Sequence, residues 1–275
     1  MIRAMGAALG IVLIFCAHPL KEKGAFWYNG YVYGTQAYSL YAEGKLEAAV
    51  ASYRKALGEA RRLDIPQQAA LYTFNIGRCF LELERLDSAL ACFSLSYAQF
   101  ASAGDSPAAA RAAGFCALTY CEMEKSDSAF AWYGRGEALG AGKSDQGLRL
   151  LVHGRLVWQR DHGKEALTYF EEAYALQKKQ KAFHAMAELC YLRAVVRHYF
   201  GDFPEAKKLI DEALALSDKS AIRPGRSRIL LAASAIYGRL GDEPAGKRFL
   251  ERAKECAPVG KIMDHELETM NPGKE

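Results

Sequence analysis

Small and large apolar residues recur at fixed positions along this chain, in six copies about forty residues apart. The two clearest copies are residues 84–93 and 124–133, which both place Asp-Ser-Ala between a charged turn and an aromatic residue. Carrying their spacing outward predicts six turn residues: Gly44, Glu84, Glu124, Asp161, Gly201 and Gly241. A period of this length predicts stacked repeats, in which each unit contacts only its neighbours.

At several positions around the turn, all six copies have residues of similar size. Seven residues before the turn, and five and twelve residues after it, every copy has Ala, Gly or Ser. Nine residues after the turn every copy has a large apolar residue: Tyr53, Phe93, Tyr133, Phe170, Ile210 and Leu250. Small residues let two helix backbones approach closely, and the large residue fills the groove between them. Each unit is therefore predicted to be helix, tight turn, helix.

Helix-breaking residues separate the predicted units, at 64–66, 104–107, 140–142 and 223–225. Within the last two units, Gly201 and Gly241 are followed by Pro204 and Pro244. Glycine tolerates the left-handed conformation that ends a helix, and proline fits the first turn of the next one. The fold class is therefore predicted to be all-α.

This pattern resembles the tetratricopeptide repeat family, in the forty-residue variant of kinesin-light-chain-like arrays, over about residues 30–256. The resemblance implies a right-handed α-solenoid of about six helix pairs, which we assign to residues 30–257. One position departs from the pattern. Arg197 occupies a column that otherwise holds Leu40, Phe80, Tyr120, Val157 and Tyr237. Either the fifth unit packs differently, or the aliphatic stem of Arg197 packs while its charge reaches the surface.

Residues 1–17 have the features of an export signal, with Arg3 followed by an uncharged run that stops at His18-Pro19. The run is too short to span a membrane. Residues 13–16 resemble a bacterial lipoprotein box, which would make Cys16 the lipidated residue, although Phe15 stands where that pattern has Gly, Ala or Ser. Cleavage near Ala17 and an uncleaved anchor are the alternatives. All three predict a location in the cell envelope, with residues 18–29 as a tether and 258–275 as a polar tail.

Composition and motifs give no support to catalysis. About a quarter of the residues are charged and the net charge is +4, which is ordinary for a folded protein and too small to indicate nucleic-acid binding. Gly142-Lys143-Ser144 resembles the end of a phosphate-binding loop but lacks the earlier glycine. No two of the six histidines have the i, i+4 spacing of a metal site. We expect no cofactor, no metal and no enzymatic activity.

The seven cysteines have two interpretations. Cys116 and Cys121 lie on one predicted helix and cannot bridge each other, and Cys116 and Cys190 fall at core-facing positions. Buried thiols that act as small hydrophobic residues are therefore predicted. Disulfides among the six cysteines other than Cys16 are the alternative in an exported protein.

The resemblance also implies a binding surface, because the first helix of each unit lines the concave groove in the family. The groove positions of the family select Tyr38, Phe74, Asn75, Arg78, Arg111, Phe115, Arg155, Trp158, Tyr191 and His198, together with Tyr31, Tyr41, Tyr199, Arg228 and Arg239. Acidic residues are few there, namely Glu82, Glu122 and Glu188. Rings and guanidiniums suit an extended peptide with acidic or aromatic side chains. Alternatively, the rings pack between units and the arginines only solvate the surface.

Two functions follow from these patterns. The first is a non-catalytic scaffold that binds a peptide or partner protein in an aromatic and basic groove, with a membrane tether at its N-terminus. The second is a ligand-binding accessory subunit of a transporter, which would need a closed pocket. The aromatic stretch from Phe26 to Tyr41 either covers the end of the array or contributes tyrosines to the groove. The sequence defines no oligomeric state.

Overall fold

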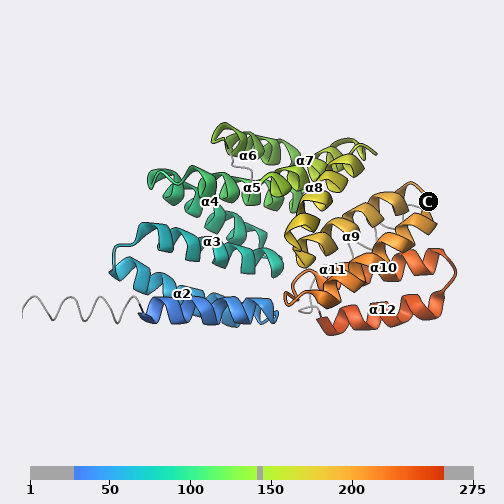
Figure 1. The fold of residues 1–275 in the computed structure, drawn as a ribbon, viewed down its shortest axis with the longest axis horizontal. Helices are drawn as coiled ribbons and strands as arrows, with labels where there is room; N and C mark the ends of the chain where they lie inside the picture. The colour runs from blue at the N-terminus through green and yellow to red at the C-terminus, as the bar shows by residue number, and fades with distance from the viewer. Residues whose placement is uncertain (1–27, 141–144, 257–275) are drawn as a thin grey trace, which may run out of the picture.

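The computed structural model describes residues 28–140 and 145–256, and these residues form helices and turns only. A first helix covers residues 28–42. It is followed by α2 (Leu46–Arg62), α3 (Pro66–Glu82), α4 (Leu86–Ser102), α5 (Ser106–Glu122), α6 (Ser126–Ala138), α7 (Gln146–Asp161), α8 (Ala166–Gln180), α9 (Phe183–Tyr199), α10 (Phe203–Lys219), α11 (Arg226–Arg239) and α12 (Glu243–Cys256). In the described ranges the helices stack as six consecutive pairs, which confirms the all-α solenoid (Figure 1). The predicted export signal, Cys16 and the predicted polar tail lie outside the described residues.

The turn inside each unit depends on one residue with left-handed backbone conformation. Five of these residues are the predicted ones: Gly44 (φ 80°), Glu84 (57°), Glu124 (58°), Gly201 (76°) and Gly241 (83°). The fourth turn differs, because the left-handed residue is His162 (φ 49°) and Asp161 is the last residue of α7. Residues 163–165 then form extra turn before α8 begins at Ala166. The prediction of Asp161 was therefore wrong by one residue, since this unit has a longer turn than the others.

The columns of small and large residues pack against each other as predicted. An ideal Cβ on Gly77 would lie 2.8 Å from Phe93 Cε1, and one on Gly154 would lie 2.5 Å from Phe170 Cε1. Both rings are fully buried. All of the small-column residues are buried except Ser234, which is half-buried. The aromatic rings thus occupy the space that a side chain on either glycine would need, and this close approach sets the distance between the two helices of a unit.

Arg197 does not disrupt the fifth unit. Its Nη1 lies 3.2 Å from Asp202 Oδ2, and its side chain is partly exposed. The two helices of this unit, α9 and α10, share one hydrophobic core that includes Cys190, Ala194 and Ile210. The charged end therefore reaches the surface while the unit packs normally, which is the second of the two expectations.

Four of the six described cysteines confirm the interpretation as buried thiols. Cys79, Cys116, Cys121 and Cys190 are buried and unbridged, Cys92 is half-buried, and Cys256 is exposed. Burial raises the pKa of Cys116 to about 12 and the pKa of Cys121 to about 11. These two thiols therefore remain protonated and act as small apolar side chains.

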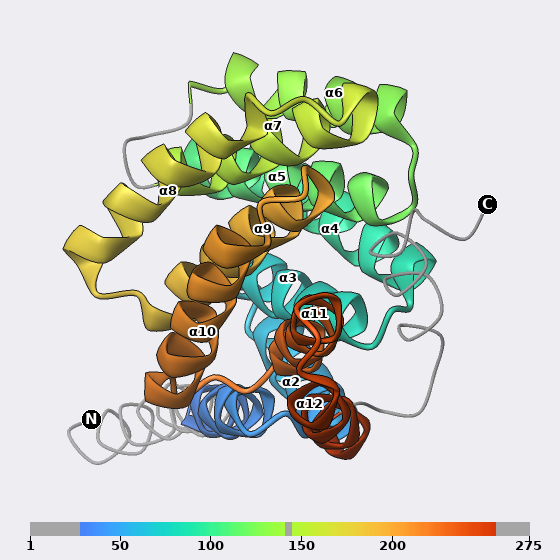
Figure 2. The same cartoon turned by 90° about the vertical axis from the view of Figure 1, so that its right-hand side faces the viewer.

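The solenoid curves until its last unit meets its first (Figures 1 and 2). Residues 220–225, which connect α10 to α11, reach the turn that follows the first helix. Here the Arg223 backbone N–H donates to the Ala42 carbonyl at 2.9 Å, and Ile222 packs on the core of the first three units. This contact joins residues far apart in the sequence and closes the concave side along one edge. No helix in the described ranges is both long enough and apolar enough to cross a membrane.

Candidate functional site

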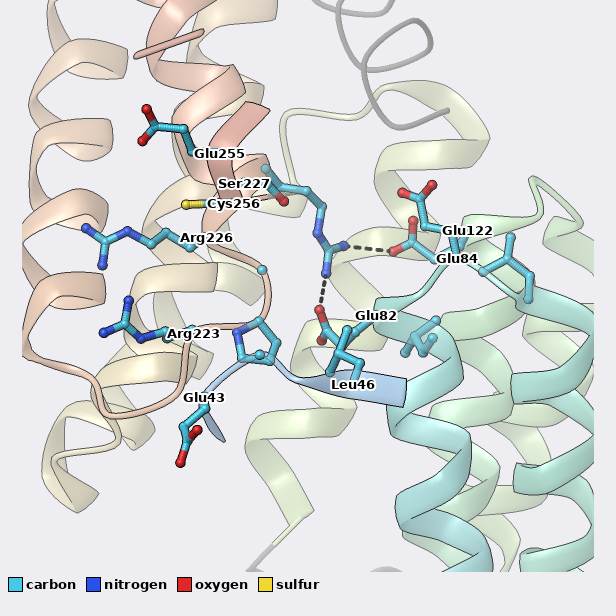
Figure 3. Close-up of a pocket in the computed structure, with 16 residues that line it drawn as sticks. Glu43, Leu46, Glu82, Glu84, Glu122, Arg223, Arg226, Ser227, Glu255 and Cys256 are labelled. Atoms are coloured by element: carbon cyan, nitrogen blue, oxygen red, sulfur yellow. Dashed lines mark ion pairs between the residues drawn. The ribbon is translucent and has the colours of Figure 1, made fainter. Parts of the chain in front are cut away.

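Two neighbouring cavities lie on the concave side of the solenoid. The first, of about 410 Å³, is lined mainly by α3, α5, α7, α9 and the end of α8, and we call it the arginine cavity because Arg78, Arg111, Arg155 and Arg228 line it. The second has a volume of about 490 Å³ and lies between residues 223–228 and two turns, the one before α2 and the one after α3. We call it the loop cavity (Figure 3). The two cavities share Leu81, Glu82, Glu122 and Arg228. They are therefore adjoining parts of one concave space.

Arg228 forms the boundary between the two cavities. From α11 its guanidinium reaches Glu82 Oε2 at 3.7 Å on α3 and Glu122 Oε1 at 3.5 Å on α5, the two ion pairs drawn in Figure 3. Glu122 Oε1 also lies 2.6 Å from Arg155 Nη1 on α7. One carboxylate thus binds two guanidiniums from different units. This network links the sixth unit to the second, third and fourth units across the concave side.

The other two arginines of the cavity have different partners. Arg111 Nε donates to Asp145 Oδ1 at 2.8 Å, and Asp145 is buried at the start of α7. Arg78 Nη2 donates to the Tyr41 hydroxyl oxygen at 3.0 Å, and its Cζ lies 4.6 Å from the Tyr41 ring centroid. Burial raises the pKa of Tyr41 well above its ordinary value. The phenol therefore stays neutral, and Arg78 has a neutral partner where Arg111 has a charged one.

The opposite wall is formed by α8 and α9. His184 and Glu188 come from α9, and Gln177 and Gln180 come from the end of α8. Apolar side chains fill the spaces between the polar ones: Phe115, Leu118, Leu148, Leu151 and Leu189. The cavity can therefore bind a ligand that has both charged groups and apolar surface.

The charge of this surface differs from the expected basic groove. Four arginines and four carboxylates line the arginine cavity, the carboxylates being Glu82, Glu122, Asp145 and Glu188. The groove positions of the first helices already included Glu82, Glu122 and Glu188, and the structure gathers these three carboxylates in one space and adds Asp145 from the connection before α7. The concave surface is therefore mixed in charge.

The structure brings together four of the ten principal predicted residues, since Arg78, Arg111, Phe115 and Arg155 all line the arginine cavity. Tyr41 and Arg228, which were also selected, line it with them. Tyr191 lines a smaller adjoining cavity that also contains Glu188 and Arg228.

The other predicted residues lie elsewhere. Phe74 is buried, with its ring centroid 5.0 Å from that of Phe115 and 5.4 Å from that of Phe93. It packs between units, as the alternative interpretation of the rings proposed. His198 is buried beside Phe203, with ring centroids 5.3 Å apart, and Asn75 is half-buried.

Trp158 belongs to an aromatic cluster at the turns of the fourth and fifth units. Its ring centroid lies 4.9 Å from His162 and 5.1 Å from Tyr199. Trp158 is absent from the residues that line the arginine cavity, although Arg155 on the same helix is among them. Within the aromatic first helix, Tyr41 lines the cavity while Tyr28, Tyr31 and Tyr38 are exposed.

Sequence reasoning missed the residues that complete the cavity. Asp145, Gln177, Gln180 and His184 lie in a connection, at the end of a second helix and at the start of a first helix. The groove positions of the family describe only the middle and end of first helices, so no repeat column pointed to them. The described ranges contain no group of three or more potential metal-binding side chains.

Comparison with known families agrees with this architecture. One tetratricopeptide repeat model matches residues 31–62, and a second matches residues 67–140. The chain contains tetratricopeptide repeats. These matches cover the first three helix pairs, and the structure shows that the same architecture continues through α7–α12. No curated protein has significant sequence similarity to the chain.

Several solved structures share the fold. The Rap conjugation gene regulator of the plasmid pLS20, in complex with the Phr* peptide, has a TM-score of 0.64 at 15% identity, covering 88% of this chain and 64% of that one. A Rap protein complexed with Competence and Sporulation Factor has a TM-score of 0.62 at 10% identity, covering 88% and 76%. Aspartyl phosphate phosphatase F from Bacillus subtilis has a TM-score of 0.59 at 9% identity, covering 89% and 74%. At these identities the similarity shows the fold alone, and the chain spans less than two thirds of the length of the first.

Proposed function

We propose that this protein is a non-catalytic interaction scaffold that binds an extended peptide, or a peptide segment of a partner protein, in the arginine cavity. The observation that carries the proposal is the convergence of guanidiniums, carboxylates and apolar side chains from several repeats on one concave space. Guanidiniums donate to peptide carbonyls and carboxylates, and the apolar walls accept side chains. The pLS20 regulator, which shares the fold, was solved with a peptide, and this adds support by analogy.

A ligand-binding accessory subunit of a transporter is the second candidate. The contact between Arg223 and Ala42 favours it, because this contact closes one edge of the concave side. A small ligand needs such an enclosure more than an extended peptide does. The two candidates share the cavity and differ in the ligand.

We further propose, from the sequence, that the protein is exported and tethered by lipid at Cys16, and that its repeats are of the forty-residue kinesin-light-chain-like variant. In bacterial cells labelled with a radioactive fatty acid, the full chain is expected to take up label. The Cys16→Ser variant is expected to lose the label while being made in equal amount, because only the cysteine thiol can receive the lipid. Autoradiography of the purified proteins measures the difference. Label that persists in the variant would rule out Cys16 as the acceptor.

Blocking the arginine cavity tests the peptide-binding proposal. Ala185 lines the cavity on α9, so Ala185→Trp places an indole in the space without removing a polar contact. Peptides selected from a displayed random library on the wild-type protein are expected to bind this variant at least about tenfold more weakly. Fluorescence polarisation with the synthesised peptides measures the affinity.

Ala91→Trp is the matched control, because Ala91 is exposed on α4. It should bind the selected peptides as the wild type does. Peptides that bind the Ala185→Trp variant with unchanged affinity would place the binding site outside the arginine cavity. Failure to select any peptide, together with a small molecule that raises the melting temperature, would favour the transporter candidate.

A further inference from the structure

Most charges of the arginine cavity neutralise one another. Glu122 binds Arg155 and Arg228, and Glu82 binds Arg228 as well. Arg111 is paired with Asp145. After these pairs, Arg78 and Glu188 are the guanidinium and the carboxylate of the cavity that form no ion pair within 4.0 Å among the described residues, since their oppositely charged neighbours Glu82 and Arg155 lie beyond that distance.

Arg78 can bind an additional anion. Its one hydrogen bond within the described residues goes to the neutral Tyr41 hydroxyl, and its ring contact is with the same tyrosine. A guanidinium has five N–H donors in a planar arrangement. Arg78 therefore keeps donors that can bind a carboxylate of a ligand, and the cation–π contact with Tyr41 holds the guanidinium plane in place.

Glu188 is the opposite case. Its half-buried carboxylate lines the cavity and has neither a hydrogen bond nor an ion pair with any residue that the structure describes. A partly desolvated carboxylate without a partner costs free energy, and a cation recovers that cost. Among the four arginines that line the same space, Arg155 interacts electrostatically with Glu188, but Arg155 and Arg228 are both bound to Glu122.

We propose that the ligand of this cavity is amphoteric, namely a peptide segment with one acidic and one basic side chain separated by apolar residues. Its carboxylate binds Arg78 on α3, its ammonium or guanidinium binds Glu188 on α9, and its apolar residues contact Phe115, Leu118 and Leu189. This inference rests on the proposed function, since it specifies the peptide. It differs from the acidic or aromatic peptide that the sequence alone suggested.

Four series of short synthetic peptides, acetylated and amidated to remove the terminal charges, test the proposal. Each peptide has an Ala/Leu segment flanked by Asp and Lys, by Asp alone, by Lys alone or by neither, with the separation varied along each series. At the best separation, the Asp/Lys peptide is expected to bind the full-length protein about tenfold more tightly than either singly charged peptide. Isothermal titration calorimetry measures the affinities.

Two variants assign the charges. Glu188→Gln is isosteric and breaks no contact within the described residues, so it should remove the preference for Lys and leave the preference for Asp. Arg78→Gln should remove the preference for Asp and leave the preference for Lys. Glu188→Lys should reverse the first preference, so that an additional series with Asp in place of Lys, and therefore two Asp residues, binds best. Arg61→Gln and Glu172→Gln, at exposed positions on α2 and α8, should change neither preference.

The outcomes separate this inference from the proposed function. If all four peptide classes bind equally and Ala185→Trp weakens them all, peptide binding in the cavity stands and the amphoteric ligand is wrong. If the Asp/Lys peptide is preferred but Glu188→Gln leaves the preference for Lys unchanged, Glu188 is not the cation site. If no peptide class binds, both the inference and the peptide-binding function are overturned.

Discussion

Replacing Phe170 with alanine is expected to lower the free energy of unfolding by about 3–5 kcal/mol, the range for buried aromatic residues. The Phe170 side chain is 1% exposed and packs over Gly154, with Leu167, Leu189 and Val196 in the same core. Gly154 has no side chain that could move into the vacated space, so the cavity would stay largely open. Urea unfolding followed by far-ultraviolet circular dichroism measures the loss.

Phe183→Ala is the matched control for this substitution. Phe183 is 37% exposed at the start of α9, so its removal should cost about 1 kcal/mol or less. The comparison separates loss of an aromatic ring as such from loss of a ring at the large-residue position of a repeat. Equal costs for the two variants would contradict the packing of Phe170 against Gly154.

Replacing Glu122 with glutamine is expected to destabilise the fold by about 1–3 kcal/mol, which is below the full cost of breaking a buried ion pair because the site is partly exposed. The side chains of Arg155 and Glu122 are 18% and 27% exposed. Glutamine keeps the shape but removes the charge that both Arg155 and Arg228 contact. Two guanidiniums would then lie close together without this carboxylate. Thermal and urea unfolding both measure the effect.

Glu47→Gln is the control for the ion-pair network. Glu47 Oε1 lies 2.5 Å from Arg85 Nη2, but these side chains are 59% and 53% exposed. Solvent screens such a pair, so its loss should cost about 0–1 kcal/mol. Both substitutions remove one carboxylate charge at a similar N–O distance. The difference between their costs in unfolding free energy therefore measures the effect of burial and of the second guanidinium at Glu122. A cost for Glu122→Gln no greater than that of the control would show that the network does not stabilise the closed solenoid.

The sequence by itself determined the repeat architecture, because the interactions that build a unit are local. Two helices of one unit meet at positions fixed by helix geometry, so a small residue at Gly154 and a large one at Phe170 specify their own contact. Left-handed turns at Gly44, Gly201 and Gly241 were predictable for the same reason, since glycine favours that backbone conformation. The left-handed residue of the fourth turn was missed because the columns of small and large residues specify helix contacts and do not specify the length of a turn.

Only the tertiary structure decided the nature of the cavity. Arg78, Arg111, Phe115 and Arg155 could be selected from the sequence, because they lie on the inward faces of single helices. The ion pairs of Arg228 with Glu82 and Glu122, and the contact of Arg223 with Ala42, could not. These contacts join distant units, and their positions depend on the sum of small rotations between successive repeats. That sum is fixed by how all the units pack together, and it decides which charges on the concave side form ion pairs with one another and which do not.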